Sequence, residues 1–563
     1  MKIEEEREYC LNCINKPCKN LGCPLENDIP NFIHEKDEEK AFELLCNTTV
    51  LPAVCGRICP KSRYCQGNCI RRFRGNPVEI GKIEAYIGDT AIEKNFKIPK
   101  FQQLNIEEIK KHQNNDESES SNTEKISEKS KIEENIPLEK NIINLENKKV
   151  AVVGAGPAGL TCSAFLAMQG VQVTIYEKNK NLGGLLTYGI PEFRLEKSIV
   201  KKSIDKILEL GIKVKTESEL GKNISLQSLL KEYDAVFLAL GAGNPKRALK
   251  GENVLSGNEL LEEIAKIGEE TKREKFEFKN KECKKQNIAE LIKKADEKSN
   301  NINSSKELNK ISIPDFKEKS VIVYGGGNVA MDTARTLIRL GAKVTIVYRR
   351  NIEQMPAEAK EIQDAQNEGA KILENASIIS FENNAANCVK TRLVQLDKET
   401  NICKESKNSK QKIEENENLT INNSKLEINA EKAKSNLAID LKVSENQKKL
   451  KDEKFKILSE KQAERQSTKI ENIEGSNFEI NADYVALAIG SSAKTEFLNS
   501  LGIETNERGF AKINEKRQTS IQNVYAGGDL IGEEATVANA ARSGREAAKA
   551  IISSFKENKK MWN

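Results

Sequence analysis

Two segments of this sequence repeat the order strand, glycine-rich turn, helix, strand. The first, "KKVAVVGAGPAGLTCSAFLAMQGVQVTIYEK", covers residues 148–178, and the second, "KSVIVYGGGNVAMDTARTLIRLGAKVTIVYRR", covers residues 319–350. In each, a short apolar run ends at a turn and a helical pattern follows, which is the order of a βαβ unit with parallel strands. Two such units predict an α/β chain with two separate three-layer domains.

The first turn has the spacing of a phosphate-binding turn. Gly154 permits the tight turn, Gly156 lets the backbone approach a pyrophosphate, and Gly159 lets helix and strand pack closely. Glu177 closes the next strand about 20 residues further on, where a carboxylate accepts hydrogen bonds from ribose hydroxyls. The turn therefore predicts a Rossmann-like dinucleotide site, against the alternative of a glycine-rich turn that only packs. The predicted binding residues of the turn are Gly154, Gly156, Pro157, Ala158 and Gly159.

The second turn differs in the charge at the end of its second strand. Arg349 and Arg350 stand where Glu177 stands in the first unit. A carboxylate there repels a 2′-phosphate, whereas an arginine pair attracts it and donates hydrogen bonds to it. This predicts NADP(H) rather than NAD(H), unless the arginines are only solvated charges. The predicted binding residues of this turn are Gly325, Gly327, Asn328, Val329 and Ala330, with alanine as an accepted variant at the third glycine position.

The stretch "VYAGGDLIGEEATVANAARSGREAAKAI" (524–551) predicts a strand end, a turn and an alanine-rich helix. Asp529, after Gly528, is suited to hydrogen-bond the ribityl and phosphate region of a flavin. Thr536 and Val537 lie where the helix begins, and we expect its N-terminus to face the isoalloxazine. The alternative is that Asp529 only caps the helix.

Two dinucleotide sites in one chain suggest a flavin enzyme that holds FAD in one site and receives the nicotinamide in the other. Hydride transfer between the two rings depends on stacking and alignment more than on a side-chain acid or base. We therefore predict no catalytic side chain. The scarcity of histidine (only His34 and His112) is no obstacle to this chemistry.

Nine of the thirteen cysteines lie before residue 70, and eight of these nine form two groups of four. "CLNCINKPCKNLGCP" has the spacing C-x2-C-x4-C-x4-C, and "CGRICPKSRYCQGNC" supplies four more, with a Cys-Pro pair in each group. Such loops are typical of two-cluster ferredoxins. Zinc is the main alternative, and packed cysteine a weaker one. A flavin that takes up two electrons needs a one-electron outlet, which iron–sulfur supplies and zinc does not.

Charge and hydropathy limit the partners and the location. The net charge of +5, from 90 basic and 85 acidic residues, gives no reason to expect nucleic acid or an anionic membrane as partner. No stretch reaches the ~18 apolar residues that a membrane helix needs. The acidic start "MKIEEEREYC" lacks the apolar run of a signal peptide, so we expect a cytoplasmic protein.

Three segments rich in Lys, Glu, Asn and Ser interrupt the chain, and we interpret them as a solvated linker (105–147) and two disordered or surface inserts (267–317 and 397–475). The predicted domains are a helical cysteine-rich domain and an FAD-binding domain that is split around an NADPH-binding domain. In chain order these cover residues 1–104 (helical), 148–266 (FAD, first part), 318–484 (NADPH) and 485–563 (FAD, second part).

The motifs in order resemble a known family. "CLNC", "LPAVCGRICP", "CQGNC", "VEIGKIEAYIGD", "GAGPAGL", "GGLLTYGIPEFRL", "VTIVYRR", "MPAE" and "YAGGD" together are similar to the small (beta) subunit of NADPH-dependent glutamate synthase. The same module occurs in NADH-dependent ferredoxin:NADP oxidoreductase, sulfide dehydrogenase and dihydropyrimidine dehydrogenase. The resemblance covers most of the chain outside the three polar segments.

The resemblance implies two 4Fe–4S clusters with interleaved ligands. One cluster takes Cys10, Cys13, Cys18 and Cys69, and the other takes Cys23, Cys59, Cys65 and Glu84, while Cys46 and Cys55 are packed non-ligands. It also implies that Gly184 and Leu185 approach the flavin and that Arg194 is a phosphate ligand or a structural residue.

The resemblance further implies that NADPH reduces FAD and that single electrons leave through the clusters. The expected partner is a large amidotransferase subunit that carries FMN. Two alternatives stay open: a related oxidoreductase that serves ferredoxin, sulfide or another acceptor, and a flavin-binding assembly module without turnover.

Overall fold

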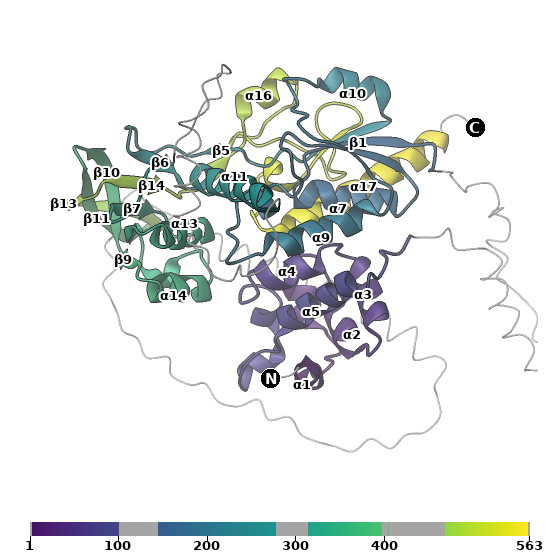
Figure 1. Cartoon of the computed structure of the whole chain (residues 1–563), viewed down its shortest axis with the longest axis horizontal. Coiled ribbons are helices and arrows are strands. Elements are labelled where there is room, and N and C mark those ends of the chain that lie inside the picture. The colour runs from purple at the N-terminus through teal and green to yellow at the C-terminus, as the bar shows by residue number, and fades with distance from the viewer. Residues whose placement is uncertain (1–2, 101–144, 277–312, 397–402, 405–467, 561–563) are drawn as a thin grey trace, which may run out of the picture.

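The structure is a computed structural model that describes residues 3–100, 145–276, 313–396, 403–404 and 468–560 (Figure 1). Most of the predicted linker 105–147 and the middle of both predicted inserts lie outside the described residues. A helical N-terminal domain lies against a larger α/β body that contains two separate parallel sheets. Within the described ranges, no helix has the length and apolar character needed to span a bilayer.

Short helices build the N-terminal domain. The longest, α5 (Ile80–Glu93), crosses α4 (Pro52–Ile58) at two glycines. A Cβ atom at Gly56 would lie 2.4 Å from the backbone of α5, and one at Gly88 would lie 2.3 Å from the backbone of α4. Only glycine permits this crossing, so both positions fix how the cysteine loops around these helices are held. The other elements are α1 (Ile3–Tyr9), η1 (Cys18–Gly22), α2 (Ile29–His34), α3 (Glu38–Cys46), η2 (Gln66–Asn68) and η3 (Ile70–Phe73).

The first sheet has the order β16-β4-β1-β2-β3, and all its strands are parallel. Val150 and Val152 of β1 pack with α7, α9 and α17, whereas Ala151 and Val153 pack with α10 and α16 on the other face. This alternation makes the predicted three layers. The elements are β1 (Lys149–Val153), α7 (Pro157–Ala167), β2 (Gln172–Tyr176), α8 (Leu185–Tyr188), α9 (Lys197–Leu208), β3 (Lys213–Lys215), α10 (Leu226–Glu232), β4 (Ala235–Leu238), α16 (Thr495–Ser500), β16 (Val524–Ala526), η6 (Gly528–Ile531) and α17 (Val537–Lys560).

The second sheet has the order β6-β14-β7-β8-β9, again all parallel. Val321 and Val323 of β7 pack with α13, whereas Ile322 and Tyr324 face the antiparallel strands β10 and β11. Its third layer is therefore a second sheet. The elements are β6 (Val254–Ser256), α11 (Gly257–Phe276), β7 (Ser320–Tyr324), α13 (Asn328–Arg339), β8 (Lys343–Val347), η5 (Ile352–Gln354), α14 (Ala359–Asn367), β9 (Lys371–Leu373), β10 (Ala376–Glu382), β11 (Ala385–Leu396), β12 (Cys403–Lys404), β13 (Thr468–Asn481) and β14 (Tyr484–Leu487). The predicted fold class, a helical iron–sulfur domain with two Rossmann-like domains, is confirmed.

The chain passes between the two sheets at a small antiparallel pair, β5 (Asn244–Pro245) with β15 (Ser491–Ser492). Both β6 and β14 belong to the second sheet. The change of sheet therefore falls earlier than the boundary predicted at 266 and later than the one predicted at 484. Composition changes at the polar segments, whereas the chain changes sheet at turns that composition does not mark.

Ordered structure also extends into both predicted inserts. Helix α11 runs on to Phe276, and strand β13 begins at Thr468. Phe316 is buried and packs edge-on against Tyr484, with 5.4 Å between the ring centroids. The predicted limits 267–317 and 397–475 are therefore too wide at these ends, because elements at the edges of a polar segment still take part in the sheet domain.

Candidate functional site

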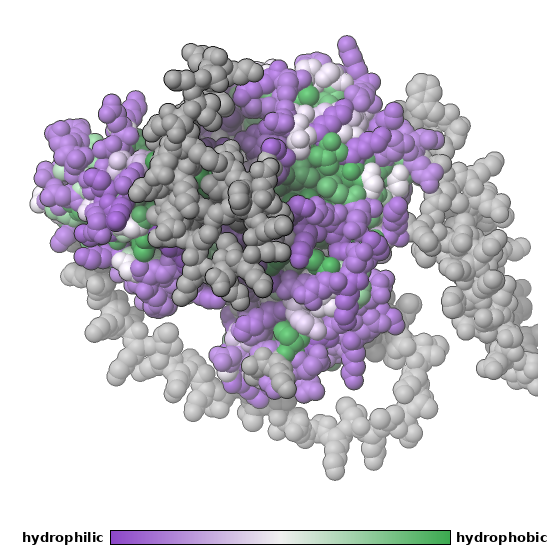
Figure 2. All heavy atoms as spheres, in the orientation of Figure 1, coloured by the Kyte–Doolittle hydropathy of each residue, from purple (hydrophilic) through white to green (hydrophobic). Residues whose placement is uncertain are grey.

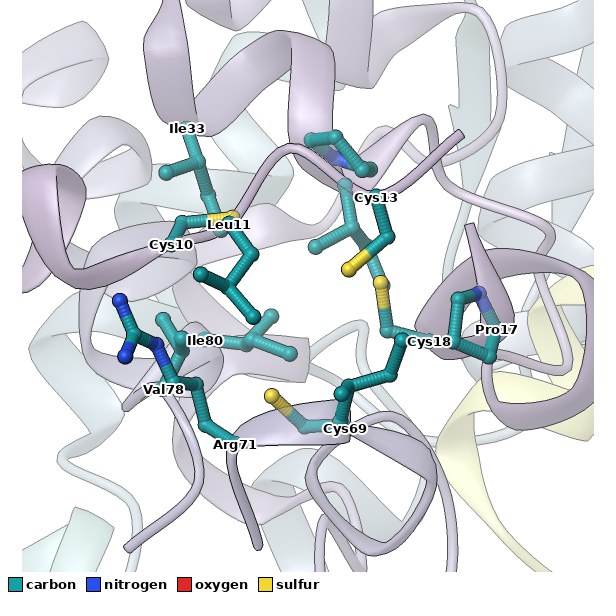
Figure 3. Close-up of a pocket in the computed structure, with 13 residues that line it drawn as sticks. Cys10, Leu11, Cys13, Pro17, Cys18, Ile33, Cys69, Arg71, Val78 and Ile80 are labelled. Atoms are coloured by element: carbon teal, nitrogen blue, oxygen red, sulfur yellow. The ribbon is translucent and has the colours of Figure 1, made fainter. Parts of the chain in front are cut away.

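The four predicted ligands of the first cluster line one pocket, which we name the first cysteine pocket. Figure 3 shows the side chains of Cys10, Cys13, Cys18 and Cys69 around a common opening, with Leu11 at its mouth. They come from the end of α1, the loop after it, η1 and the turn between η2 and η3. Cys69 lies 51 positions after Cys18, so only the tertiary fold brings this set together.

Burial and mutual repulsion disfavour free thiolates in this pocket. Burial raises the pKa of Cys18 to about 12, and the neighbouring Cys10 and Cys69 raise it further. Burial likewise raises the pKa of Cys10. A buried group of thiols that repel one another when ionised gains a compensating positive charge when it binds iron. The donor set and its electrostatics fit an iron–sulfur cluster.

The second set of predicted ligands lines a second pocket, which we name the second cysteine pocket. Cys23, Cys59, Cys65 and Glu84 surround it, and Ala538 of α17 closes one side. Burial raises the pKa of Cys23 to about 11, and the Glu84 carboxylate adds to the effect. Three thiols and one carboxylate from separate loops and from helix α5 thus meet at one place.

Glu84 is fully buried on α5, where the sequence alone suggests an exposed helix residue. Burial raises the pKa of its carboxyl to about 7, against the opposite influence of Lys61 and of Asn27. The Asn27 Nδ2 donates to Glu84 Oε1 at 3.1 Å, and Thr48 Oγ1 donates to Asn27 Oδ1 at 2.7 Å. This chain of hydrogen bonds fixes the carboxyl toward the pocket.

Two further cysteines of this domain behave differently. Cys55, predicted as a packed non-ligand, lines the second cysteine pocket and lies 3.8 Å from Thr49 Oγ1. Cys46 is buried in the hydrophobic core and lines neither pocket. In the described part of the chain, no three His, Cys, Asp or Glu side chains are arranged to hold a single metal ion. A 4Fe–4S cluster binds each ligand through a different iron atom, so its ligands surround a space instead of converging on one point.

The first glycine-rich turn has the backbone that a dinucleotide needs. Gly154 has a φ of +104°, and a Cβ atom there would lie 2.3 Å from Ala239 O. A Cβ atom at Gly159 would lie 1.9 Å from Gly154 O, so the helix passes close to the turn. At Gly156 a Cβ atom would meet no protein atom within 4 Å. That open space at the N-terminus of α7 is where a pyrophosphate would contact the free N–H groups beyond Pro157.

The two acids predicted for this site hold it in different ways. Glu177 is buried, and its carboxylate accepts hydrogen bonds from Ala155 N at 2.8 Å and from Asn179 N at 2.9 Å, so it orders the turn itself. Burial raises the pKa of Asp529, whose carboxylate has no hydrogen-bond partner among the described side chains and backbone groups. A partly buried acceptor without a partner fits the hydroxyls of a bound flavin nucleotide.

The other predicted FAD residues gather around the same turn. A Cβ atom at Gly528 would lie 3.1 Å from the Ala158 Cβ, and one at Gly184 would lie 3.0 Å from the Gly156 Cα. Leu185 is 54% exposed on α8 although it is apolar, which fits a face that a ring system covers. Thr536 and Val537 begin α17, where Thr536 Oγ1 accepts from Asn539 N at 3.2 Å. Gly184 and Gly528, which are distant in the sequence, therefore both lie against the first glycine-rich turn.

The second turn repeats this geometry in the second sheet domain. A Cβ atom at Gly325 would lie 2.3 Å from Ala488 O, whereas at Gly327 it would meet no protein atom within 4 Å. Ala330 is fully buried under the turn, and Val329 is exposed. Asn328 Oδ1 accepts from Glu358 N at 3.0 Å, so this side chain ties the turn to the start of α14.

Arg349 and Arg350 follow β8 beside this turn. Arg349 is exposed, and Arg350 Nε is buried without a hydrogen-bond partner. Among the ion pairs of the described residues, neither guanidinium contacts a carboxylate, so both are free to bind an anion. This fits a 2′-phosphate.

The sequence did not reveal a loop that touches all three domains. Residues 61–64 lie between Cys59 and Cys65. Tyr64 OH donates to Glu534 Oε2 at 2.9 Å and accepts from Asn539 Nδ2 at 3.0 Å at the start of α17. Burial raises the pKa of Tyr64 well above its usual value. The only sequence feature that marks this loop is its position between Cys59 and Cys65, and that position does not predict the contact with α17.

Arg194 has a structural place. Its Nη1 donates to Asp332 Oδ2 at 2.6 Å, and its Nε lies 3.3 Å from Glu361 Oε1. All three side chains are largely buried between the "PEFRL" loop of the first sheet domain and helices α13 and α14 of the second. Of the two roles considered for Arg194, the contacts support the structural one.

Fold and sites together define an NAD(P)H oxidoreductase that uses FAD and iron–sulfur. Residues 1–96 match the family profile described as dihydropyrimidine dehydrogenase domain II, 4Fe–4S cluster, and residues 148–406 and 413–544 match that of the pyridine nucleotide-disulphide oxidoreductases.

Three curated proteins extend this match. The glutamate synthase [NADPH] small chain of Escherichia coli K12 is 30% identical over 68% of this chain and 67% of its own length. The small chain of Halomonas elongata is 27% identical over 96% and 89%. The NAD-dependent dihydropyrimidine dehydrogenase subunit PreT of Escherichia coli O157:H7 is 30% identical over 69% and 75%. The chain belongs to the family of pyridine nucleotide-disulphide oxidoreductases that includes the glutamate synthase small chain.

Proposed function

We propose that this chain is the electron-input subunit of a glutamate synthase. In this proposal NADPH reduces FAD, and single electrons then pass through two 4Fe–4S clusters to a partner subunit. The similarity to two small chains, one of them over almost the whole chain, supports the assignment.

One observation carries the proposed electron route. Ala538, in the first turn of α17, lines the second cysteine pocket, and the preceding Thr536 and Val537 are predicted flavin-site residues. In this proposal the same turn of helix borders both the flavin and the second cluster. Arg545 on α17 donates to Leu25 O at 2.7 Å and to Thr48 O at 2.9 Å, which fastens the helix to the cysteine-rich domain.

In this proposal the chain's own residues bind and orient the two nucleotides and exclude water from them. The turns at Gly156 and Gly327 present helix N-termini to two pyrophosphates, and Arg349 and Arg350 select the nucleotide phosphate. The loop 61–64 keeps the second cysteine pocket against α17. When bound, FAD supplies the conversion of a two-electron donor into one-electron steps. No side-chain acid or base is required.

The ligand sets are tested by counting iron. We expect about eight iron atoms per chain, four for each of two clusters. Cys13→Ser and Cys59→Ser should each lose about half of the iron and keep FAD. Cys46→Ala is the matched control, since this buried cysteine lines neither pocket, and it should keep all the iron. Iron loss in the control alone, or none in the other two variants, would contradict the assignment.

The partner is tested with the purified chain and a separately produced glutamate synthase large subunit. The expected result is a complex that forms glutamate from 2-oxoglutarate and glutamine with NADPH. The similarity to PreT favours a second candidate, in which the same input module serves a pyrimidine-reducing partner. Ferredoxin is a further acceptor of this class. Two results would favour these alternatives. They are NADPH-dependent electron transfer to a pyrimidine-reducing partner, or to ferredoxin, in each case without a complex with the large subunit.

A further inference from the structure

Four large apolar side chains are exposed beside the first cysteine pocket. Ile14 is 97% exposed, Phe73 74%, Leu11 49% and Ile70 43%. They are half of the eight large hydrophobic residues that are exposed in the described chain. Figure 2 shows a small hydrophobic area on the otherwise largely hydrophilic N-terminal domain, close to the N-terminus. Apolar residues gathered in this way on one surface are typical of an interaction site.

Three arginines are interspersed with these apolar residues. Arg71, Arg72 and Arg74 lie in the same segment as Ile70 and Phe73. Among the described ion pairs none includes any of the three, and the Arg72 guanidinium instead lies 4.7 Å from the centroid of the Phe73 ring. The surface is therefore apolar with positive charge that no residue of the described chain neutralises by an ion pair.

This surface is held in place by the end of α1. Arg71 Nε donates to Tyr9 O at 2.8 Å, and the Arg71 guanidinium lies 4.2 Å from the centroid of the Tyr9 ring. Tyr9 OH donates to Asn76 O at 3.1 Å, which fixes the far end of the same segment. A surface that is ordered before binding loses little conformational entropy when a partner docks.

Part of this surface also lines the first cysteine pocket. Leu11, labelled in Figure 3, and Ile70 line that pocket, and each directly follows a predicted cluster ligand, Cys10 or Cys69. The second cysteine pocket is instead closed by Ala538 of α17, in the first sheet domain, and by Tyr64, whose hydroxyl donates to Glu534 just before that helix. If electrons enter at the flavin side, they leave on the side of the first pocket.

We propose that Leu11, Ile14, Ile70 and Phe73, with Arg72 and Arg74, form the docking surface for a one-electron carrier protein that presents acidic residues around an apolar centre. The inference rests on the proposed electron route from FAD through the clusters, independently of the large subunit as partner, and adds where a carrier protein binds and what its surface is like. Charge complementarity of this kind speeds encounter and fixes orientation, and the apolar centre supplies contact at short range. The balanced reaction is one NADPH with two oxidised carriers, which gives NADP⁺, one proton and two reduced carriers.

The test uses the full chain with its cofactors and an acidic plant-type ferredoxin as probe. The charge variant is Arg72→Glu with Arg74→Glu, and the apolar variant is Ile14→Ser with Phe73→Ser. The matched controls are Arg508→Glu and Ile379→Ser, which change an exposed arginine and an exposed isoleucine in the sheet domains. NADPH-driven reduction of ferricyanide, which needs no docking, is measured in parallel.

We expect the charge variant to lower kcat/KM for ferredoxin by about tenfold at low salt, and the loss to shrink at about 1 M salt, where charges are screened within ~3 Å. The apolar variant should lower it at both salt concentrations. Ferricyanide reduction and both controls should be unchanged.

Each other outcome has a separate meaning. If ferredoxin is not reduced, or is reduced equally well by the charge variant and its control, the proposed docking surface is overturned. Ferricyanide reduction by the same chain then leaves the proposed function standing. If the unsubstituted chain with its cofactors does not reduce ferricyanide with NADPH, the proposed function itself is overturned. Arginine-dependent binding to phosphatidylserine vesicles without an effect on ferredoxin identifies a lipid surface as the occupant and also overturns the proposal.

Discussion

The hydroxyl of Ser62 lies 2.9 and 2.8 Å from the two carboxylate oxygens of Glu358, 296 residues further along the chain. Ser62 belongs to the loop between the predicted cluster ligands Cys59 and Cys65, and Glu358 N donates to Asn328 in the second glycine-rich turn. Arg63 Nε lies 3.7 Å from the same carboxylate. A single acid therefore joins the nucleotide turn to the cysteine-rich domain.

This contact should appear as coupling in a double-mutant cycle. We expect Ser62→Ala and Glu358→Ala each to raise KM for NADPH. The loss in kcat/KM of the double variant, expressed as a free energy, should be smaller than the sum of the two single losses by about 1 kcal/mol. The measurement is steady-state ferricyanide reduction. Ser198→Ala, an exposed serine on α9, is the control. Strict additivity would mean that the contact carries no coupling.

The buried ion pair of Arg194 should matter more for stability than an exposed one. Arg194→Met leaves the carboxylates of Asp332 and Glu361 without this partner in a site with little water, and we expect a loss of about 3 kcal/mol in the free energy of unfolding. Arg247→Met removes an exposed arginine that pairs with Glu259, and we expect about 0.5 kcal/mol. Urea unfolding of both variants provides the comparison, and equal losses would contradict the structural role of Arg194.

How far the sequence alone leads depends on the range of the contacts. The glycine turns, with their strand before and helix after, are local patterns, and the fold around Gly154 and Gly325 follows from them. The place of Glu84 did not follow from local pattern, because helix α5 buries it only when the loop that carries Asn27 packs against it. Only the resemblance to a family singled it out.

Contacts between domains were the part that pattern did not predict. Nothing near Tyr64 or Ser62 in the sequence indicates Glu534 or Glu358 as a partner, since these pairs are hundreds of residues apart. The chain changes sheet away from the boundaries predicted at 266 and 484 for a related reason. Strand β6 looks the same in either sheet, and only its pairing with β14 decides where it belongs.

Asp332 should make stability depend on pH. Burial raises the pKa of its carboxyl to about 6 from its ordinary 3.8, with Arg194 acting in the opposite direction. The folded chain thus holds this proton more tightly than the unfolded chain. The stabilising contribution is complete below pH 3.8 and is lost as the pH rises through about 6. In Asp332→Asn this loss should be absent, so the difference in thermal midpoint between the unsubstituted chain and the variant should change from pH 4 to pH 7.

The control for this titration is Asp205→Asn, which changes a carboxyl that is half exposed on α9. Parallel curves for the unsubstituted chain and Asp332→Asn would show that Asp332 does not titrate there.

Gly156→Ala should separate folding from FAD binding. A Cβ atom at this position meets no protein atom within 4 Å, and the residue has an ordinary φ of −74°, so the chain should fold. The added methyl group occupies the space next to the pyrophosphate, and we expect FAD retention to weaken by at least about tenfold, the effect of one lost hydrogen bond to a charged group. Gly268→Ala on α11, also with no atom within 4 Å, should keep its flavin. Flavin absorbance per chain and circular dichroism measure the two effects.

The preference between the two nicotinamide nucleotides should depend on the arginine pair after β8. Arg350 Nε is buried without a partner, and Arg349 is exposed beside it, so both can meet a 2′-phosphate without first breaking an ion pair. Replacing both with serine should raise KM for NADPH by about 10- to 100-fold, since hydrogen bonds to charged groups are worth about 1.5–3 kcal/mol. KM for NADH, which lacks this phosphate, should change little. Arg392→Ser on β11 serves as a control outside the turn. If KM rises equally for NADPH and for NADH, the arginines contact a part that the two nucleotides share. The preference for NADPH over NADH then has another source.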